Sequence, residues 1–402
     1  MIYHLIDLLK DFDFPGQGLF QYLSFRAIIS FSTALLFSIL FGKKFIAKIK
    51  AKQIGEDIRD LGLAGQMEKK GTPTMGGILI FFSIIIPVLL FANLTNIYIQ
   101  LLLVTTVWSF LIGFADDYIK VFKKNKDGLS PKMKLIAQFA MGLAVALAVC
   151  FSDDIVVRES TENIVKSTTT TIPFIKTHQF DYAWLSPFGG QFGIYFKWVI
   201  YVAMIILVIT SCSNGVNLTD GIDGLATGTS AIVGVVLGIF AWLGGNIIDA
   251  EYLNIMYIPG SGEIAVFMSA FVGALIGFLW YNSFPAQVFM GDSGSLMLGG
   301  IIGVAAILIR KELLVPILCG IFFAESLSVL MQTTYFKYTR KKYGAGRRIF
   351  KMTPIHHHFQ KEGIPCLIQS DKKAIPEAKI VTRFWIVGMI LAVITIALLK
   401  IR

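Results

Sequence analysis

Five aspartates stand where long apolar stretches of the chain end: Asp116, Asp117, Asp220, Asp223 and Asp292. Carboxylate oxygens are hard ligands, and they suit Mg²⁺ or Mn²⁺ better than zinc. Lysines and histidines lie nearby in the sequence and would supply positive charge for an anion. Glycines flank Asp220, Asp223 and Asp292 and let the backbone come close to a ligand. Carboxylates, a hard cation, basic residues and open loops together indicate phosphoryl transfer.

These aspartates belong to a set of five polar segments, each in a connection between two apolar stretches. The segments are KKGTPTMGG (69–77), ADDYIK (115–120), SCSNGVNLTDGIDGLATG (211–228), YNSFPAQVFMGDSGSL (281–296) and MTPIHHHFQKEG (352–363). They occupy alternate connections between the apolar stretches, and the other connections carry no comparable motif. Successive membrane crossings return alternate connections to the same side. We therefore expect all five segments to meet at one face of the molecule.

The elements that must position these segments are transmembrane helices. The chain has 402 residues, of which 55% are hydrophobic and 15% are charged, whereas a soluble protein of this length would expose far more charge. A span needs about 20 mostly apolar residues, and continuous rather than alternating hydrophobicity favours helices over a β-barrel. We therefore expect an all-α integral membrane protein with ten transmembrane helices, near 21–42, 75–94, 97–115, 133–152, 194–212, 225–244, 264–281, 290–309, 313–336 and 380–399.

The placement of basic residues predicts the orientation of these helices. Lysines and arginines concentrate in the connection 43–74, just after Asp117, and in 337–379, whereas 245–263 has none. Basic connections stay in the cytoplasm. With ten spans, all five polar segments then face the cytoplasm, and both termini lie outside.

The stretch 153–191 does not span a membrane, and the same parity places it outside. It is polar and rich in threonine, and we expect a small external hairpin there without catalytic residues. No second domain is indicated, so residues 1–402 are predicted to form a single transmembrane domain that carries this insertion. Four cysteines show no paired spacing, so we expect neither a disulfide nor a cysteine metal site.

The adjacent aspartates allow two interpretations. Neighbouring residues on a helix point about 100° apart, so Asp116 and Asp117 cannot easily be equivalent ligands of one ion. One would face a metal or a nucleophile, and the other would orient a lysine such as Lys120, which lies one turn after Asp116 on the same face. The plainer alternative is a solvated helix end with an ion pair worth about 0.3–0.5 kcal/mol.

The remaining motifs also have plainer interpretations. NLTDGIDG is compatible with a turn in which Asp and Gly act as caps, and its spacing excludes an EF-hand. GDSGS resembles a serine-protease sequence, but it begins a membrane helix and lacks fitting His and Asp partners. The histidine run 356–358 alone is compatible with a basic patch or a transition-metal site. Glu325 falls within an apolar stretch, where we expect a structural role, either paired with Gln332 or lining a groove.

Taken in order on ten spans, the motifs closely resemble those of phospho-N-acetylmuramoyl-pentapeptide transferases. This family belongs to the polyprenyl-phosphate N-acetylhexosamine-1-phosphate transferase superfamily. The resemblance covers about residues 20–400, although 153–191 is longer than the family pattern. It implies an enzyme of peptidoglycan synthesis in the bacterial inner membrane, with its site on the cytoplasmic face. The reaction would join undecaprenyl phosphate to UDP-N-acetylmuramoyl-pentapeptide, giving lipid I and UMP, with Mg²⁺ as the cofactor.

The resemblance also implies roles for individual residues. The implied catalytic residues are Asp116, Asp117, Lys120, Asp292 and His356. The implied metal ligands are Asp292, which would bind Mg²⁺ directly, and Asn217. The implied substrate-binding residues are Lys70, Lys134, Asn217, Leu218, Asp220, Gly221, Asp223, Asn282, Phe289, His357 and His358.

The resemblance leaves two mechanisms open. In one, Asp116 deprotonates or positions the lipid phosphate, which attacks the sugar-bearing phosphorus directly. In the other, an aspartate first forms a covalent phospho-sugar intermediate. A phosphate whose second pKa is about 6 is already a nucleophile near pH 7, which favours direct attack.

Two other functions remain as alternatives. A related transferase of N-acetylglucosamine-1-phosphate would share most motifs, although the uninterrupted histidine run favours the muramoyl-pentapeptide enzyme. A secondary transporter would need polar or broken helices at the bilayer midplane, whereas the carboxylates here cluster at one face. The expected partners are the two substrates and membrane lipid, without nucleic acid. The peptide's third residue and the oligomeric state stay open, with a homodimer as one option.

Overall fold

The computed structural model describes residues 1–8, 16–52, 69, 71–125, 127–158, 164–175, 179–369 and 373–400. Within these ranges most residues are helical. The main helices are α2 (Leu23–Lys52), α3 (Gly77–Phe91), α4 (Ile97–Val121), α5 (Pro131–Phe151), α6 (Gly190–Thr219), α7 (Leu225–Gly245), α9 (Gly262–Asn282), α10 (Asp292–Leu308), α12 (Gly320–Tyr343) and α14 (Glu377–Leu398). The shorter elements are α1 (Ile2–Leu8), α8 (Ile247–Leu253), α11 (Val315–Leu318), α13 (Ile355–Gln360) and the 3₁₀ turns η1 (Gln17–Gln21), η3 (Tyr182–Leu185) and η4 (Glu312–Leu314).

A helix lies at every predicted membrane segment, but not all of them have the expected length. Among the described residues, seven helices are long and apolar enough to cross a membrane, or eight if the bent pair Glu312–Leu318 and Gly320–Tyr343 forms one span. That pair bends by 77° at its break. The other two segments are α3 and α10, which are shorter apolar helices of 15 and 17 residues. The chain is a mostly helical multi-pass membrane protein.

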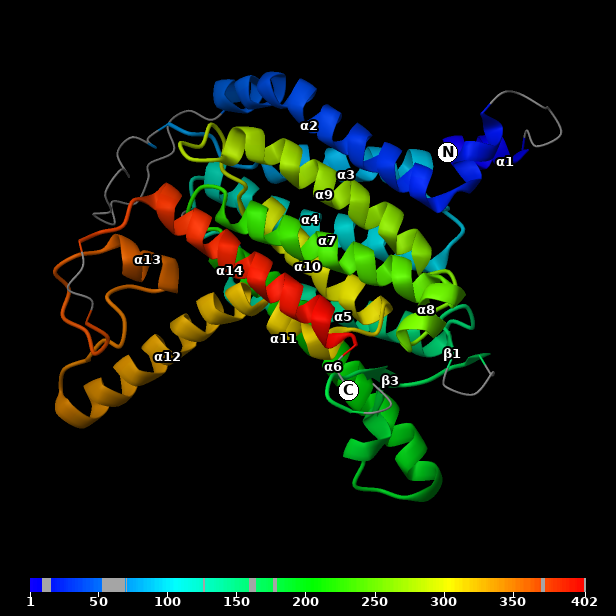
Figure 1. Cartoon of the computed structure of the whole chain (residues 1–402). Coiled ribbons are helices and arrows are strands. Elements are labelled where there is room, and N and C mark those ends of the chain that lie inside the picture. Colours follow the sequence, from blue (N-terminus) through cyan, green and yellow to red (C-terminus); the bar gives the residue numbers. More distant parts are fainter. Residues whose placement is uncertain are drawn as a thin grey trace.

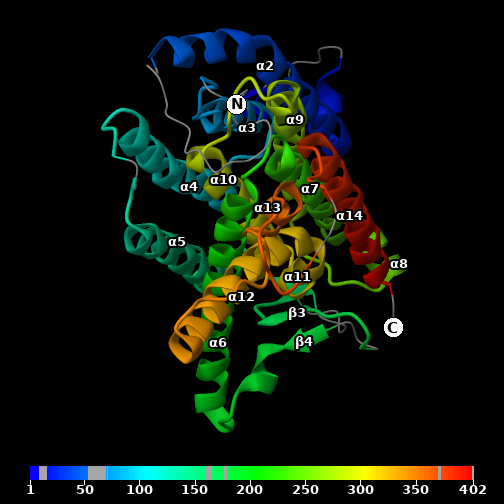
Figure 2. The ribbon, with the colours of Figure 1, turned by 90° about the vertical axis from the view of Figure 1, so that its left-hand side faces the viewer.

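Helix α10 lies at the centre of the bundle. Every residue from Ser293 to Leu308 is buried, so this helix has no solvent-facing or lipid-facing side. Helices α4 and α6 pack along it, and α3 and α7 also contact it (Figure 2). Helix α9 packs between α2 and α7 (Figure 1). The short apolar segment that begins at Asp292 is therefore the core of the fold, and it holds Asp292 at one end of that core.

The predicted insertion forms two short antiparallel hairpins rather than one. Strands β1 (Val157–Arg158) and β2 (Ile164–Val165) form the first, and β3 (Thr169–Thr171) and β4 (Gln179–Asp181) form the second. The second hairpin is fastened to the far end of α10, because the N–H of Thr171 donates to the carbonyl of Arg310 at 3.1 Å.

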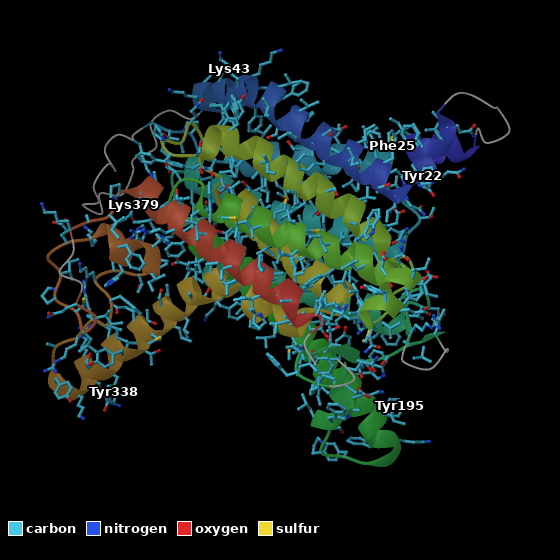
Figure 3. All side chains as sticks on the ribbon, viewed as in Figure 1. Tyr22, Phe25, Lys43, Tyr195, Tyr338 and Lys379 are labelled. Carbon is cyan, nitrogen blue, oxygen red and sulfur yellow. The ribbon has the colours of Figure 1, made fainter. Side chains whose placement is uncertain are left out.

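The two ends of the bundle carry different elements. In Figure 1, α13 and the connection that follows α12 lie at the left-hand end, whereas α1, α8 and β1 lie at the right. Figure 3 places Lys43, Tyr338 and Lys379 at the left-hand end, and Tyr22 and Phe25 at the other. The ion pairs and hydrogen bonds given below join the first four motif segments, and the fifth lies against the third, because a Cβ added to Gly221 would lie 2.2 Å from Nε2 of His356. The motifs thus meet in one place, as the alternation of connections predicts.

Candidate active site

Asp117 caps the buried helix α10. Gly291 precedes this helix with φ 75°, a backbone conformation that favours glycine. The N–H groups of Asp292 and Ser293 donate to the two carboxylate oxygens of Asp117, at 3.0 and 2.9 Å. A carboxylate at a helix N-terminus satisfies N–H groups that have no partner within the helix, and the helix dipole stabilises its charge. Asp117 thereby joins the ADDYIK motif to GDSGS and holds the backbone of Asp292.

Asp116 makes a different set of contacts. Its carboxylate lies 2.6 Å from Nζ of Lys120 and 3.0 Å from Nζ of Lys134, and it accepts the N–H of Leu129 at 2.7 Å. Both lysines also reach the carboxylate of Asp292, at 3.2 and 2.5 Å. The ion pair between Asp116 and Lys120 is therefore one part of a larger network, in which two carboxylates share two ammonium groups.

Three carboxylates lie close enough together to hold a metal ion. Asp116, Asp117 and Asp292 each offer one oxygen, and these atoms lie within 4.8 Å of one another. Anionic oxygens of this kind fit a hard divalent cation. The hydrogen bonds of Asp116 and Asp117 differ, as their rotation about the helix predicts. One oxygen of each nevertheless lies within 4.8 Å of the other and of Asp292, because α4 packs on α10.

Asn217 holds Asp292 from the α6 side. Its Nδ2 donates to Oδ1 of Asp292 at 3.0 Å and to Oγ of Ser295 at 2.9 Å. The amide nitrogen faces the carboxylate, whereas a metal would need the amide oxygen. In this arrangement Asn217 orients Asp292 and does not itself present a metal ligand.

Two backbone segments, 72–77 and 286–290, lie side by side next to these carboxylates. The N–H of Phe289 donates to the carbonyl of Pro73 at 2.8 Å, and the Phe289 carbonyl accepts the N–H of Gly76 at 2.9 Å. These bonds join the first motif to the fourth. They leave the side chain of Phe289 half-buried on the wall that the two segments form.

Asn282 braces the same wall from behind. It is buried, its Oδ1 accepts the hydroxyl of Thr227 at 2.7 Å, and its Nδ2 donates to the carbonyl of Val288 at 3.0 Å. Both ends of this amide are thus used to hold the connection between α9 and α10.

A basic residue of the first motif reaches the opposite side of the site. The predicted Lys70 lies outside the described residues, but its neighbour Lys69 lies 2.7 Å from Asp223 and 2.6 Å from Glu377. The N–H of Asp223 also donates to Glu377 at 2.7 Å. The Lys69 ammonium lies 6.0 Å from the ring centroid of Phe289. Lys69 and Glu377 were not among the predicted site residues, and the only signal for Glu377 was an acidic residue at the start of the last apolar segment.

Asp220 follows α6 at the turn of the NLTDGIDG motif. Loss of solvation raises the pKa of Asp220 to about 8, and the negative charges of Asp292 and two further aspartates act in the same direction. A cation bound nearby would favour the ionised form of this carboxyl group. Leu218 is half-buried and Gly221 is exposed, so the turn is open at one edge.

The three histidines lie in the short helix α13, and all of them are buried. His357 Nδ1 shares a hydrogen bond of 2.7 Å with Gln360, and burial lowers the pKa of His357 to about 4. His358 Nδ1 accepts the N–H of Lys351 at 3.1 Å, and burial lowers the pKa of His358 as well. His356 is completely buried against α12. The three consecutive histidine side chains therefore lie in three different environments.

Glu325 takes a partner that the sequence analysis did not predict. Its Oε2 lies 3.1 Å from Nδ1 of His356. Gln332, the expected partner, instead accepts the N–H groups of Ile349 and Phe350 at 2.9 and 3.1 Å. Spacing along α12 suggested the first pair, but the fold brings the histidine segment against this helix and supplies both residues with partners from outside it.

The arrangement is chemically suited to phosphate groups. Lys120 keeps a side-chain exposure of 34%, so a ligand can reach the lysines and carboxylates at this end of α10. Ammonium groups that now neutralise carboxylates can bind phosphate oxygens, and the carboxylates can bind a cation that the phosphates also need. The site can therefore assemble anionic substrates and a divalent cation at the end of a membrane helix bundle.

Two protein-family models match the chain. A model of glycosyl transferase family 4 matches residues 99–310, which include Asp116 and Asp292. A phospho-N-acetylmuramoyl-pentapeptide-transferase signature matches residues 69–81, the first of the five motifs.

Full-length relatives agree with these matches. Phospho-N-acetylmuramoyl-pentapeptide-transferases of Parabacteroides distasonis, Azobacteroides pseudotrichonymphae and Flavobacterium psychrophilum are 55%, 54% and 53% identical to the chain, and each comparison covers 100% of both proteins. The compared regions span the whole chain and therefore include the segments that build the carboxylate–lysine network. On these grounds the chain belongs to the phospho-N-acetylmuramoyl-pentapeptide transferase family.

Proposed function

We propose that this enzyme transfers phospho-N-acetylmuramoyl-pentapeptide from its UDP conjugate to undecaprenyl phosphate, giving lipid I and UMP for peptidoglycan synthesis. The observation that carries the proposal is the network at the start of α10, where Asp116, Asp117 and Asp292 lie within 4.8 Å of one another and share Lys120 and Lys134. A lipid phosphate and a soluble nucleotide can meet only where a membrane helix bundle ends, and the network lies there.

The three aspartates would hold Mg²⁺, with Asp292 as the principal ligand. When bound, this ion would offset the negative charge of the diphosphate and of the leaving UMP. Asn217 would keep Asp292 oriented, since it already donates to Oδ1 at 3.0 Å. Lys120 and Lys134 would bind phosphate oxygens of the two substrates.

The contacts of the aspartates favour direct attack over a covalent intermediate. Both oxygens of Asp117 accept N–H groups of α10, and both oxygens of Asp116 are paired with lysines or with the N–H of Leu129. These contacts give Asp117 the role of a helix cap and Asp116 the role of a partner of two lysines, and direct attack keeps both roles. An oxygen of the lipid phosphate would form the new bond to the sugar-bearing phosphorus, and the bond from that phosphorus to the UMP oxygen would break. Asp116 would position the lysines that hold the attacking phosphate.

The nucleotide would bind over the wall formed by the first and fourth polar segments. Phe289 would stack on uracil beside Lys69, and the backbone at Leu218 and Gly221 would hydrogen-bond to the base. The remaining predicted contacts would come from Lys70, Asp220, Asp223, Asn282, His356, His357 and His358.

We also propose that the site faces the cytoplasm in a bacterial inner membrane and that both termini lie outside. The basic connections at the motif-bearing end support this orientation. Labelling of single cysteines introduced at Lys43 and Tyr22 of the full chain in inverted vesicles tests it. The cysteine at position 43 should react in inverted vesicles, and the cysteine at position 22 should react only after permeabilisation. The reverse pattern would contradict the orientation.

The reaction itself is tested with purified protein, UDP-N-acetylmuramoyl-pentapeptide and undecaprenyl phosphate. We expect release of UMP that depends on Mg²⁺ and stops when the ion is chelated. Turnover with UDP-N-acetylglucosamine instead would identify the sister activity. Movement of substrate across vesicles without UMP release would identify a transporter.

A further inference from the structure

Glu325 is a buried carboxyl group in α12. It lies in α12 with no exposed surface, where an unpaired charge would be strongly unfavourable. Its Oε2 lies 3.1 Å from Nδ1 of His356 and 3.4 Å from the backbone nitrogen of the same residue. Two contacts to one residue hold both the ring and the backbone of His356 against α12.

The other nitrogen of this ring faces the site. Neither ring nitrogen of His356 makes a hydrogen bond of good geometry among the described residues, although the residue is completely buried and Nδ1 lies 3.1 Å from Oε2 of Glu325. Nε2 is the nitrogen on the side of the ring away from this contact. It points at the NLTDGIDG turn, since a Cβ added to Gly221 would lie 2.2 Å from it. A buried nitrogen without a partner is unfavourable unless a ligand or water satisfies it. Its direction makes the substrate bound at this turn the natural partner.

Helix α12 presents a second anchor to the same segment. Gln332 lies seven residues after Glu325, two turns along the same face, and binds the backbone of Ile349 and Phe350. Helix α13, which carries His356, packs against α12 (Figure 2). One face of α12 thus holds the histidine segment at both ends, and Glu325 is the anchor that touches a side chain.

We propose that Glu325 is a positioning residue for His356. The carboxylate lies 3.1 Å from Nδ1, and this contact fixes the rotation of the ring and so keeps Nε2 directed at the substrate bound beside Gly221. This inference rests on the proposed function, because the group that Nε2 contacts is the substrate of that reaction. Glu325 itself touches no substrate and acts through the imidazole.

The test replaces the carboxyl group by an acceptor that lacks the charge and by an apolar group of similar size. Glu325→Gln keeps an oxygen for Nδ1, and its kcat should stay within about threefold of the unmodified enzyme. Glu325→Leu removes the acceptor, and its kcat should fall by about 30-fold or more while KM for the UDP substrate changes by less than about threefold. Ser328→Ala is the matched control, because Ser328 is buried on the same helix and donates only to the carbonyl of Glu325. Its kcat should be unchanged.

Three results would overturn the proposal. They are a kcat of Glu325→Leu equal to that of the unmodified enzyme, equal loss of kcat in Glu325→Gln and Glu325→Leu, and a rise of KM without a fall of kcat. If Glu325→Leu does not fold, the folded Glu325→Gln variant still decides the question. Loss of its turnover would exclude positioning through the retained side-chain oxygen. The unmodified enzyme is assayed in parallel. Failure of that enzyme to release UMP would count against the proposed function, whereas the results above concern Glu325 alone.

Discussion

The two ends of helix α10 both carry acidic and basic side chains, but they are built differently. At its start, the side chains of Asp292, Lys134 and Lys120 are 17%, 19% and 34% exposed. Beyond its other end, Arg310 and Glu312 are only 1–2% exposed. One cluster is open to a ligand, and the other is sealed under the β3–β4 hairpin.

The sealed cluster is occupied by partners from within the chain. Nζ of Lys311 donates to the hydroxyl of Thr171 at 2.6 Å, and the hydroxyl of Tyr182 donates to Glu312 at 3.3 Å. Arg310 donates to the hydroxyl of Tyr201, and its guanidinium lies 4.9 Å from the centroid of that ring. Charges with fixed internal partners stabilise one structure, whereas exposed charges that share partners can exchange them for a substrate. Variants at the two ends should therefore affect different quantities.

The largest effect is expected from Asp292→Asn at the open end. A neutral amide is a poorer ligand for Mg²⁺, so turnover measured as UMP release should fall by at least about 100-fold while the thermal midpoint in detergent stays near its original value. Asp249→Asn is the matched control, since Asp249 also lies in the first turn of a helix, α8, outside the site. Near-normal turnover of Asp292→Asn at ordinary Mg²⁺ would remove Asp292 from the proposed metal site.

At the sealed end, Arg310→Met should reverse this pattern. The variant leaves the buried hydroxyl of Tyr201 without its charged partner, and we expect a loss of about 3 kcal/mol in stability, seen as a lower thermal midpoint. The kcat of the protein that remains folded should stay within about twofold. A normal midpoint combined with lost turnover would show that the two ends are not separate in function.

A smaller loss of stability is expected from Thr171→Val, because this variant weakens the attachment of the β3–β4 hairpin to the end of α10. The variant removes the acceptor of the buried Lys311 ammonium, at a cost of about 1–2 kcal/mol. Thr170→Val is the comparison, because the hydroxyl of Thr170 donates to the carbonyl of Arg310 at 3.2 Å and interacts with Glu312, whereas that of Thr171 accepts from Lys311. Equal midpoints for the two variants would contradict the role given to the Lys311 contact.

The smallest expected effect concerns pH at the open end. The pKa of His357 is lowered to about 4 in the folded protein, mainly by burial, so the unfolded chain takes up the proton first as the pH falls. The contribution of His357 to stability is complete above about pH 6.5 and is lost as the pH falls toward 4. At pH 6 the loss is about 1 kcal/mol. His357→Gln should flatten the thermal midpoint between pH 7 and pH 5. Parallel curves for the two proteins would count against a buried neutral imidazole.

Local pattern was enough to predict much of this molecule. A run of about 20 apolar residues specifies a membrane helix without reference to the rest of the chain, and a helix lies at each of the ten predicted segments. Alternation of connections was likewise enough to predict that five polar segments meet. Three helices departed from the pattern, since α3 and α10 are short and the segment 313–336 is sharply bent. These departures concern the length or the bend of a helix, which hydropathy along the chain does not report.

The sequence alone determined the family, the helical membrane architecture and the residue types of the site, because these depend on order and composition along the chain. The partner of each side chain was decided only by the tertiary structure. Asp117 caps a helix that begins 175 residues later, and Glu325 binds His356 rather than the nearer Gln332. Lys69 reaches Glu377 across 308 residues. Helical spacing relates residues within one element, whereas these contacts depend on which faces of separate helices pack together.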